Sequence, residues 1–229
     1  MPFNANLLPD PSNEYVAWVD IMGIQSAMGR SLSISANFIF KLHIAALATP
    51  RDDVQLYPVM DGFYATSPSR EAMQNFLRAV LSKVGQEFLS TAEPLHRFIV
   101  RGALAFGPIV HGSNVPDAVD QGLVGNDQYK SAIFLGMPVV QAYLGEHNAP
   151  PFGIFIHESA RAFAPNGTEP FHHVWWKWVT PDVGNVWNNL LERLNSHYEW
   201  CAERPNRLLY EASRIEAHRK LANEYFAQE

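Results

Sequence analysis

Two apolar periods alternate along residues 15–112, and their order constrains the fold more than any other feature of the sequence. Short apolar runs of β type predict strands, and apolar residues three and four positions apart predict helices. We expect, in order, a strand over 15–20, a long helix over 24–46, strands over 54–56 and 63–66, a helix from Ser67 to Phe88, and a strand over 97–106 that Gly107-Pro108 breaks. The order β-α-β-β-α-β predicts an α+β fold, with a ferredoxin-like core, an antiparallel sheet and two helices on one face.

The rest of the chain is expected to add an arm and further helices to this core. The sequence predicts a polar arm over 113–127, a helix in the second half of 132–146, short strands over 152–156 and 174–179, and amphipathic helices over 186–227 divided near Pro205. Three tryptophans between 175 and 178 are typical of a core or a subunit interface. We divide the chain into a lead-in (1–14), a core domain (15–180) and a C-terminal helical extension (181–229).

Two carboxylates, Asp20 and Asp61, stand where predicted strands end or bend. Asp61 precedes Gly62, and an Asp-Gly step between strands is a strong hairpin signal. Neighbouring strands would bring the two acids together, and at about 4 Å and a dielectric of about 20 they would repel by roughly 4 kcal/mol. Such a pair needs a proton or a cation, and a divalent metal is the obvious one. Each acid alone also fits a turn former or a helix N-cap.

The residues after Asp20 suit a phosphate. Gly23 allows the backbone to pass close to a ligand, and the predicted helix from Ile24 would begin with free N–H groups. The sequence therefore predicts an anion site beside the two carboxylates.

The composition of the chain limits which kinds of partner and which metal ligands are expected. The net charge of −6 gives no bulk basic surface for a nucleic-acid polymer or an anionic membrane. Cys201 is the only cysteine, so any metal ligands must be oxygen or imidazole, and a reducing compartment is expected. The first 13 residues lack a signal-peptide pattern, and no apolar run approaches the about 20 residues that span a bilayer. We expect a cytoplasmic protein without membrane insertion.

Four motifs in this order resemble those of the class III nucleotidyl cyclases, the family of adenylate and guanylate cyclase catalytic domains. They occupy residues 19–24, 60–65, 100–110 and 136–146, and the similarity spans roughly residues 15–160. The resemblance implies that residues 15–180 form a catalytic domain in which Asp20, the backbone carbonyl of Ile21 and Asp61 hold two divalent ions, Mn²⁺ or Mg²⁺. It also implies a homodimer with the site between its subunits. The turn that contains Gly23 and Ile24 would then carry the substrate phosphates.

Some family positions differ in this sequence. Val140 and Leu144 stand where purine cyclases carry the asparagine and arginine that steady the ribose and the transition state. We therefore assign Arg101, on the strand beside both acids, to the phosphates, because its guanidinium can bind them in a bidentate manner. An outward-facing surface or interface arginine is the alternative.

The base-reading position also differs. Tyr57, four residues before Asp61, replaces the lysine that reads the base in purine cyclases, and the partner position falls near Ile133. A phenol cannot supply the cationic donor, which indicates a different base. The sequence is similar to the bacterial antiphage pyrimidine cyclases of the Pycsar system. That similarity implies conversion of UTP to 3′,5′-cyclic UMP and pyrophosphate, with CTP as the alternative substrate, and an effector, often transmembrane, that binds the product.

Two other interpretations remain open from the sequence. A degenerate cyclase fold that only binds nucleotides or partners is consistent with the missing arginine. A polymerase-like palm that joins two nucleotides would share the two-acid geometry.

Overall fold

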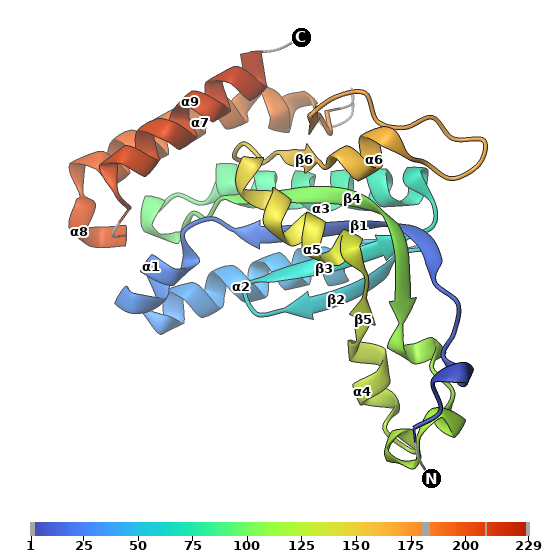
Figure 1. Cartoon of the computed structure of the whole chain (residues 1–229). Coiled ribbons are helices and arrows are strands. Elements are labelled where there is room, and N and C mark those ends of the chain that lie inside the picture. The colour runs from blue at the N-terminus through green and yellow to red at the C-terminus, as the bar shows by residue number, and fades with distance from the viewer. Residues whose placement is uncertain (1–2, 180–183, 209, 228–229) are drawn as a thin grey trace.

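One mixed sheet forms the centre of the molecule (Figure 1). The computed structural model describes residues 3–179, 184–208 and 210–227. The strands of the sheet lie in the order β2-β3-β1-β4-β6-β7, and the short β5 pairs with the far end of β4. All pairs are antiparallel except β4 with β6. The strands are β1 (Ser12–Ile21), β2 (Gln55–Val59), β3 (Gly62–Ser67), β4 (Val100–His111), β5 (Phe134–Leu135), β6 (Ile154–Ile156) and β7 (Trp175–Trp176).

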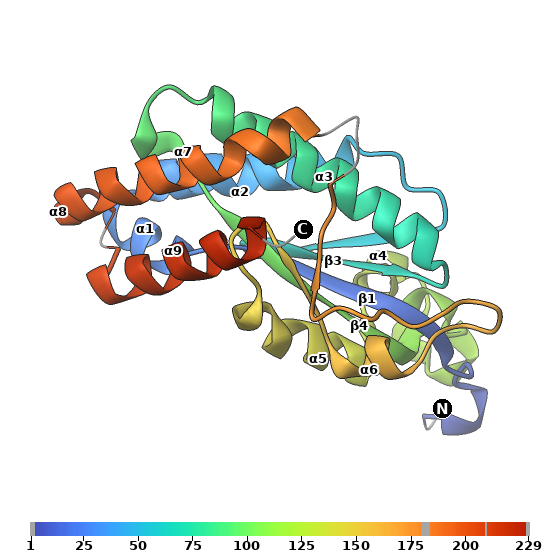
Figure 2. The same cartoon turned by 90° about the horizontal axis from the view of Figure 1, so that it is seen from above.

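Helices cover both faces of the sheet (Figure 2). Helices α2 and α3 cover one face, and α5 covers the other. In the C-terminal extension, α7 packs on α3 and α9 packs on α7, while the Tyr225 hydroxyl donates to the carbonyl of Trp176 at the β7 edge (2.9 Å). The helices are α1 (Ile24–Arg30), α2 (Leu32–Leu47), α3 (Arg70–Ser90), α4 (Asp127–Ala132), α5 (Met137–Gly145), α6 (Glu158–Ala162), α7 (Gly184–Glu203), α8 (Pro205–Leu208) and α9 (Ala212–Ala227).

The central strand β1 is buried on both faces, as its nearly continuous apolar run predicts. Its odd-numbered residues from Tyr15 to Ile21 enter the main core under α2 and α3. Val16 and Trp18 enter a smaller core under α5. Because side chains alternate along a strand, Asp20 follows Trp18 on the α5 side of the sheet.

The predicted fold class is confirmed. The β-α-β-β-α-β order, the hairpin at Met60-Asp61 and the C-terminal helical extension are all present, and the extension divides at Pro205. Trp178 is fully buried and its Nε1 donates to the carbonyl of Phe152 (2.7 Å), so its role is in the core. The boundaries between lead-in, domain and extension stay a prediction.

Three sequence predictions about elements were wrong in detail. The long helix over 24–46 is two helices, because Ser31 is extended and its hydroxyl caps α2 by accepting from the N–H of Ile34 (3.4 Å). Strand β4 continues through Gly107-Pro108. Pro108 lies where neither β6 nor β5 pairs with that edge of β4, so the N–H that it lacks costs no bond there. The strand expected over 174–179 is limited to Trp175–Trp176.

Among the described residues, none of the helices is both long and apolar enough to cross a membrane.

Candidate functional site

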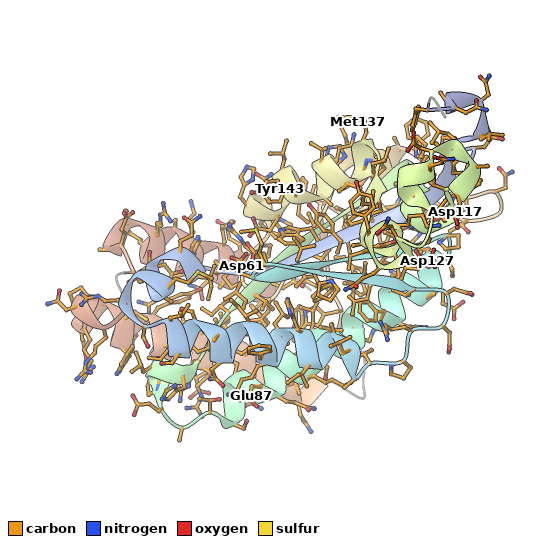
Figure 3. The ribbon with its side chains drawn as sticks, turned by 90° about the horizontal axis from the view of Figure 1, so that it is seen from below. Asp61, Glu87, Asp117, Asp127, Met137 and Tyr143 are labelled. Carbon is orange, nitrogen blue, oxygen red and sulfur yellow. The ribbon has the colours of Figure 1, made fainter. Side chains whose placement is uncertain are left out.

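The two carboxylates meet at one end of the sheet. Asp20 pairs with Gly62 across β1 and β3, and Asp61 is the residue before Gly62 in the two-residue turn of the β2–β3 hairpin. A Cβ atom at position 62 would lie 2.4 Å from the carbonyl oxygen of Val19, so only glycine allows this close approach. Figure 3 shows Asp61 at the hairpin end, between α2 and the helix α5 that carries Tyr143. The structure therefore brings Asp20 and Asp61 together.

Burial and neighbouring charges raise the pKa of Asp20 to about 7. Burial is the largest cause, and the negative charges of Asp61 and Glu146 add to it, while the N–H of Ile21 and the Arg101 guanidinium act in the opposite direction. The ionised form of Asp20 thus lacks enough positive charge around it, which is the situation that a bound cation corrects.

The donor set around Asp20 fits a hard divalent ion only in part. No group of three or more His, Cys, Asp or Glu side chains arranged to hold a metal occurs within residues 3–179, 184–208 and 210–227. Two carboxylates and the carbonyl of Ile21 leave coordination positions for water and substrate phosphate, which is how Mg²⁺ is usually held at phosphate-transfer sites. The residues present therefore fit an ion that binds together with its substrate.

Arg101 lies directly opposite Asp20, on β4. Its guanidinium is already engaged, because Nε donates to the Glu146 carboxylate and Nη1 to the carbonyl of His147 (3.3 Å). Both side chains of the Arg101–Glu146 pair are mostly buried. Binding of a phosphate by Arg101 would have to compete with Glu146.

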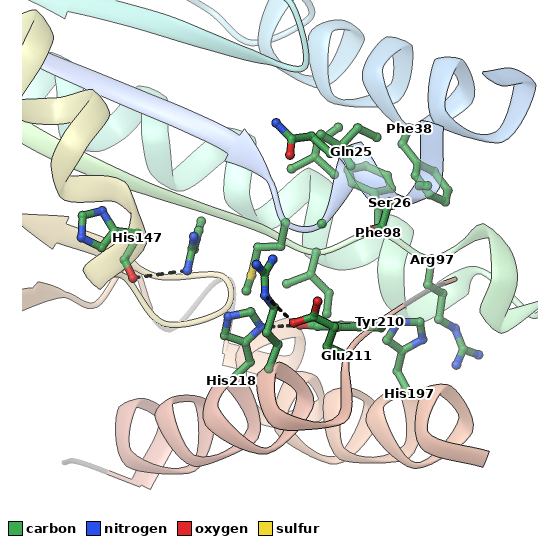
Figure 4. Close-up of a pocket in the computed structure, with 18 residues that line it drawn as sticks. Gln25, Ser26, Phe38, Arg97, Phe98, His147, His197, Tyr210, Glu211 and His218 are labelled. Atoms are coloured by element: carbon green, nitrogen blue, oxygen red, sulfur yellow. Dashed lines mark hydrogen bonds and ion pairs between the residues drawn. The ribbon is translucent and has the colours of Figure 1, made fainter. Parts of the chain in front are cut away.

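The turn after Asp20 opens onto a cavity of about 540 Å³ (Figure 4). Gly23 has φ 74°, a left-handed conformation that favours glycine, and this turns the chain from β1 into α1. Ile21, Gly23, Ile24 and Arg101 all line the cavity. The structure thus gathers four of the predicted site residues around one space.

Tyr57 lies in a buried hydrogen-bonded network further along β2. Its hydroxyl is 2.7 Å from Oε1 of Gln55 and 2.6 Å from Nδ1 of His111, and Nε2 of His111 is 3.0 Å from the Glu14 carboxylate. The ring of Tyr57 stacks on Phe134 with 4.1 Å between centroids. Burial, together with the charge of Glu14, raises the pKa of Tyr57 to about 12, so the hydroxyl keeps its proton at neutral pH. A role for Tyr57 in base reading stays a prediction, and that role would act through a hydroxyl whose partners are already in place.

Comparison with known proteins gives one consistent result. No protein-family model matches the sequence, and no curated protein matches it. Among solved structures, the guanylyl cyclase domain of the RhoGC fusion protein from the aquatic fungus Blastocladiella emersonii, in a non-canonical dimeric form, superposes with a TM-score of 0.50, 18% identity, and coverage of 68% of this chain and 84% of that chain. A monomeric double mutant of that domain superposes with a TM-score of 0.50 and 17% identity, and the match covers 66% of this chain and 82% of that chain.

A third match is the catalytic core of a rhodopsin-guanylyl cyclase with converted specificity, in complex with ATPalphaS. It has a TM-score of 0.50, 17% identity, and coverage of 66% of this chain and 80% of that chain. The chain has the cyclase fold. At this level of identity the likeness concerns the fold alone, and the chemistry must be argued from the residues of this chain.

Two residues of α5 have apolar side chains at the positions where, by the sequence resemblance, purine cyclases carry polar ones. Val140 and Leu144 are 48% and 58% exposed. Neither apolar side chain can supply the polar contacts that the sequence comparison assigns to these positions.

Sequence reasoning missed several residues around the site. Glu146 lies within the last of the four motifs, but only the structure shows that it faces Asp20 and Arg101. The pairing of Glu14 with His111 joins the start of β1 to the end of β4, which lie side by side because the strands are antiparallel. No local sequence pattern indicates this pairing. The cavity also takes residues from the C-terminal extension, for which the sequence carried no site signal: Tyr210, Glu211, Arg214 and His218.

Proposed function

We propose that this protein is a pyrimidine nucleotide cyclase that converts UTP to 3′,5′-cyclic UMP and pyrophosphate. The observation that carries the proposal is the meeting of Asp20 and Asp61 at one strand end, where burial and neighbouring carboxylates raise the pKa of Asp20 to about 7. The cyclase fold, the raised pKa of Asp20, and the position of its neighbours Ile21 and Arg101 on the cavity wall support metal-assisted chemistry on a nucleotide.

In this mechanism the ribose 3′-hydroxyl attacks the α-phosphorus of the same nucleotide. The new O–P bond forms as the bond to the β-phosphate breaks, pyrophosphate leaves, and the hydroxyl proton passes to solvent. Asp20, Asp61 and the carbonyl of Ile21 would hold two Mg²⁺ or Mn²⁺ ions, which lower the pKa of the attacking hydroxyl and offset the phosphate charge. Gly23, Ile24 and Arg101 would orient the phosphates.

The choice of a pyrimidine rests on Tyr57. A neutral phenol with its proton retained can donate or accept one hydrogen bond to a base edge, whereas the lysine of purine cyclases only donates. The similarity to antiphage pyrimidine cyclases favours UTP over CTP. On the same basis we propose a homodimer in the cytoplasm, and an effector that binds cyclic UMP during infection.

One experiment tests the proposal directly. The purified protein is incubated with each of the four ribonucleoside triphosphates and Mn²⁺, and pyrophosphate and the nucleotide product are measured. We expect cyclic UMP, and an Asp61→Asn variant that keeps its fold by circular dichroism should form none. Full activity in Asp61→Asn would falsify the two-carboxylate mechanism, and a linear or dinucleotide product would indicate polymerase-like chemistry.

A second candidate is a nucleotide-binding module without turnover. The exposed apolar side chains of Val140 and Leu144, at positions where catalysis needs polar groups in purine cyclases, favour it. In that case the incubation would give nucleotide binding but no pyrophosphate with any of the four substrates.

A further inference from the structure

The cavity beside the site has two walls from distant parts of the sequence. One wall is formed by residues 21–27, which run from the end of β1 through the turn at Gly23 into α1, together with Arg101. The other comes from the start of α9 and the residues before it, where Tyr210, Glu211 and His218 face the turn (Figure 4). The C-terminal extension therefore closes the same space that the predicted phosphate-binding turn opens.

The charge of the cavity walls is opposite to that of the whole chain. Three arginines, Arg97, Arg101 and Arg214, line the cavity, and Glu211 is the acidic residue among the described side chains that line it. Burial, and then the charges of Arg101 and Arg214, lower the pKa of His218 to about 4, so both guanidinium groups act on one ring. In a chain of net charge −6, this concentration of arginine indicates a site for an anion.

A buried histidine also lines the cavity. His197 lines the cavity, is only 2% exposed, and has no hydrogen-bond partner for Nδ1 among the residues that the structure describes. Burial, with the nearby charge of Arg97, lowers the pKa of His197 to about 4, so the ring is neutral. Buried polar atoms are almost always paired with protein, water or ligand. Nδ1 itself has almost no accessible surface, so His197 contributes a neutral, buried ring to the cavity wall and no charge.

Of the three arginines, Arg214 is the one most able to turn toward a ligand. Arg97 donates to the carbonyls of Thr91 and Ala92 (2.8 and 3.1 Å), which ties it to the chain before β4. Arg214 pairs with Glu211 at 3.2 Å, and both side chains are about two-thirds exposed, 65% and 68%. Ion pairs of this kind contribute little to stability, so exchange of Glu211 for a phosphate costs little.

The backbone that carries Arg214 is nevertheless held in place. The Tyr210 hydroxyl is hydrogen-bonded to Nδ1 of His218, one turn on the other side of Arg214. Burial raises the pKa of Tyr210, so the hydroxyl remains available for this bond. The exposed side chain of Arg214 thus extends from a helix end that is anchored at the cavity.

We propose that the C-terminal extension forms one wall of the substrate site of its own chain, and that Arg214 binds the polyphosphate of a nucleoside triphosphate. The nucleoside part of this assignment rests on the proposed function, whereas the polyphosphate part rests on the cavity. Arg214 would thereby supply, from the extension, a cation that α5 lacks at Val140 and Leu144.

The test is binding of inorganic tripolyphosphate to the full chain, measured by isothermal titration calorimetry without divalent metal. We expect Arg214→Ala to weaken binding about tenfold, as loss of one bidentate phosphate contact does. The matched control is Arg207→Ala, which removes one positive charge from the same extension but does not line the cavity, and should bind within about twofold of the unmodified protein. Glu211→Gln should tighten binding, because it releases Arg214 from its partner.

Equal affinities of Arg214→Ala and Arg207→Ala would overturn the proposal, and so would absence of tripolyphosphate binding by the unmodified chain. The four-substrate incubation is run on the same samples. If binding depends on Arg214 but none of the triphosphates is turned over, the polyphosphate site stands and the cyclase proposal falls. Circular dichroism verifies that each variant is folded.

Discussion

The Tyr57 hydroxyl lies 2.6 Å from Nδ1 of His111. Because the Glu14 carboxylate is 3.0 Å from Nε2 of the same ring, we assign the ring proton to Nε2, and Nδ1 then accepts the hydroxyl proton of Tyr57. Oε1 of Gln55 can only accept, so it competes with Nδ1 for the same hydroxyl proton, and the lone pairs of the Tyr57 oxygen are left for a ligand. If Tyr57 reads a base, the orientation of its hydroxyl is set by His111 and, through His111, by Glu14.

We predict that Tyr57→Phe reduces selectivity more than stability. The Phe134 stacking remains, but Nδ1 of His111 loses its donor, which costs about 1 kcal/mol of unfolding free energy. If the hydroxyl reads the base, the ratio of kcat/KM for UTP over the other triphosphates should fall about tenfold. Tyr64→Phe, on the neighbouring strand, is the control. An unchanged ratio with a lower Tm would make Tyr57 a structural residue only.

Glu14 should stabilise the fold in a pH-dependent way. Burial alone would raise the pKa of Glu14, but hydrogen bonds from His111 and Ser12 outweigh it and leave the pKa below its usual value of 4.5. A carboxyl with a lowered pKa stabilises the folded state above the ordinary value, and that contribution is lost as the pH falls through the folded pKa. We expect Glu14→Gln to lower Tm at pH 7 and to differ less from the unmodified protein below about pH 4, measured by thermal unfolding. A constant difference across this range would contradict the pairing.

Asp20 should have the opposite pH dependence in metal-free protein. Its pKa is raised from 3.8 to about 7, so the folded state binds the proton more tightly, and its contribution to stability, present below about pH 4, is lost as the pH rises through about 7. We expect Asp20→Asn to be more stable than the unmodified chain at pH 8, by up to about 4 kcal/mol, and to have lost activity. At pH 8, Mn²⁺ should raise the Tm of the unmodified protein and not that of the variant. Equal shifts in both would place the ion elsewhere.

Glu146 should weaken phosphate binding, because it competes with the phosphate for Arg101. Its carboxylate holds the Arg101 guanidinium and adds to the negative potential at Asp20. We predict that Glu146→Gln tightens binding of inorganic tripolyphosphate several-fold without metal, because Arg101 becomes available. The same variant should lower the pKa of Asp20, which would reduce the stability gain of the additional Asp20→Asn change at pH 8. Weaker tripolyphosphate binding by Glu146→Gln would mean that Glu146 positions Arg101 for the phosphate instead.

The sequence predicted the elements whose local chemistry is sufficient to form them. The Asp61-Gly62 step predicted a hairpin at this place, although the two turn residues are Met60 and Asp61 and the positive φ is at Met60. The apolar stripe from Met73 to Phe88 predicted α3, because side-chain period is a local property. The break at Ser31 was missed because the apolar period around it favoured one continuous helix. Pro108 was predicted to end the strand because proline lacks the N–H that a paired strand residue donates. Whether this loss matters depends on which neighbours pair with β4 at that point, and the sequence does not show this.

The candidate site was predictable only in the part that lies on consecutive strands. Asp20 and Asp61 follow from strand order, whereas the partner of Arg101 and the network around Tyr57 depend on tertiary contacts between residues 45 and 54 positions apart. The place of Arg214 at the cavity depends on the path of the extension back over residues 21–27, which no sequence pattern in the extension predicts.

The close fit of Gly62 against β1 links correct folding to chemistry. If β3 shifted by one position along β1, every side chain of the hairpin would change faces, and Asp61 would leave its place beside Asp20. Such a molecule could still be compact, yet its two carboxylates would no longer meet. In a shifted register a residue with a Cβ atom would stand at this position and clash with the carbonyl oxygen of Val19. The steric restriction at Gly62 therefore disfavours the misaligned hairpin during folding.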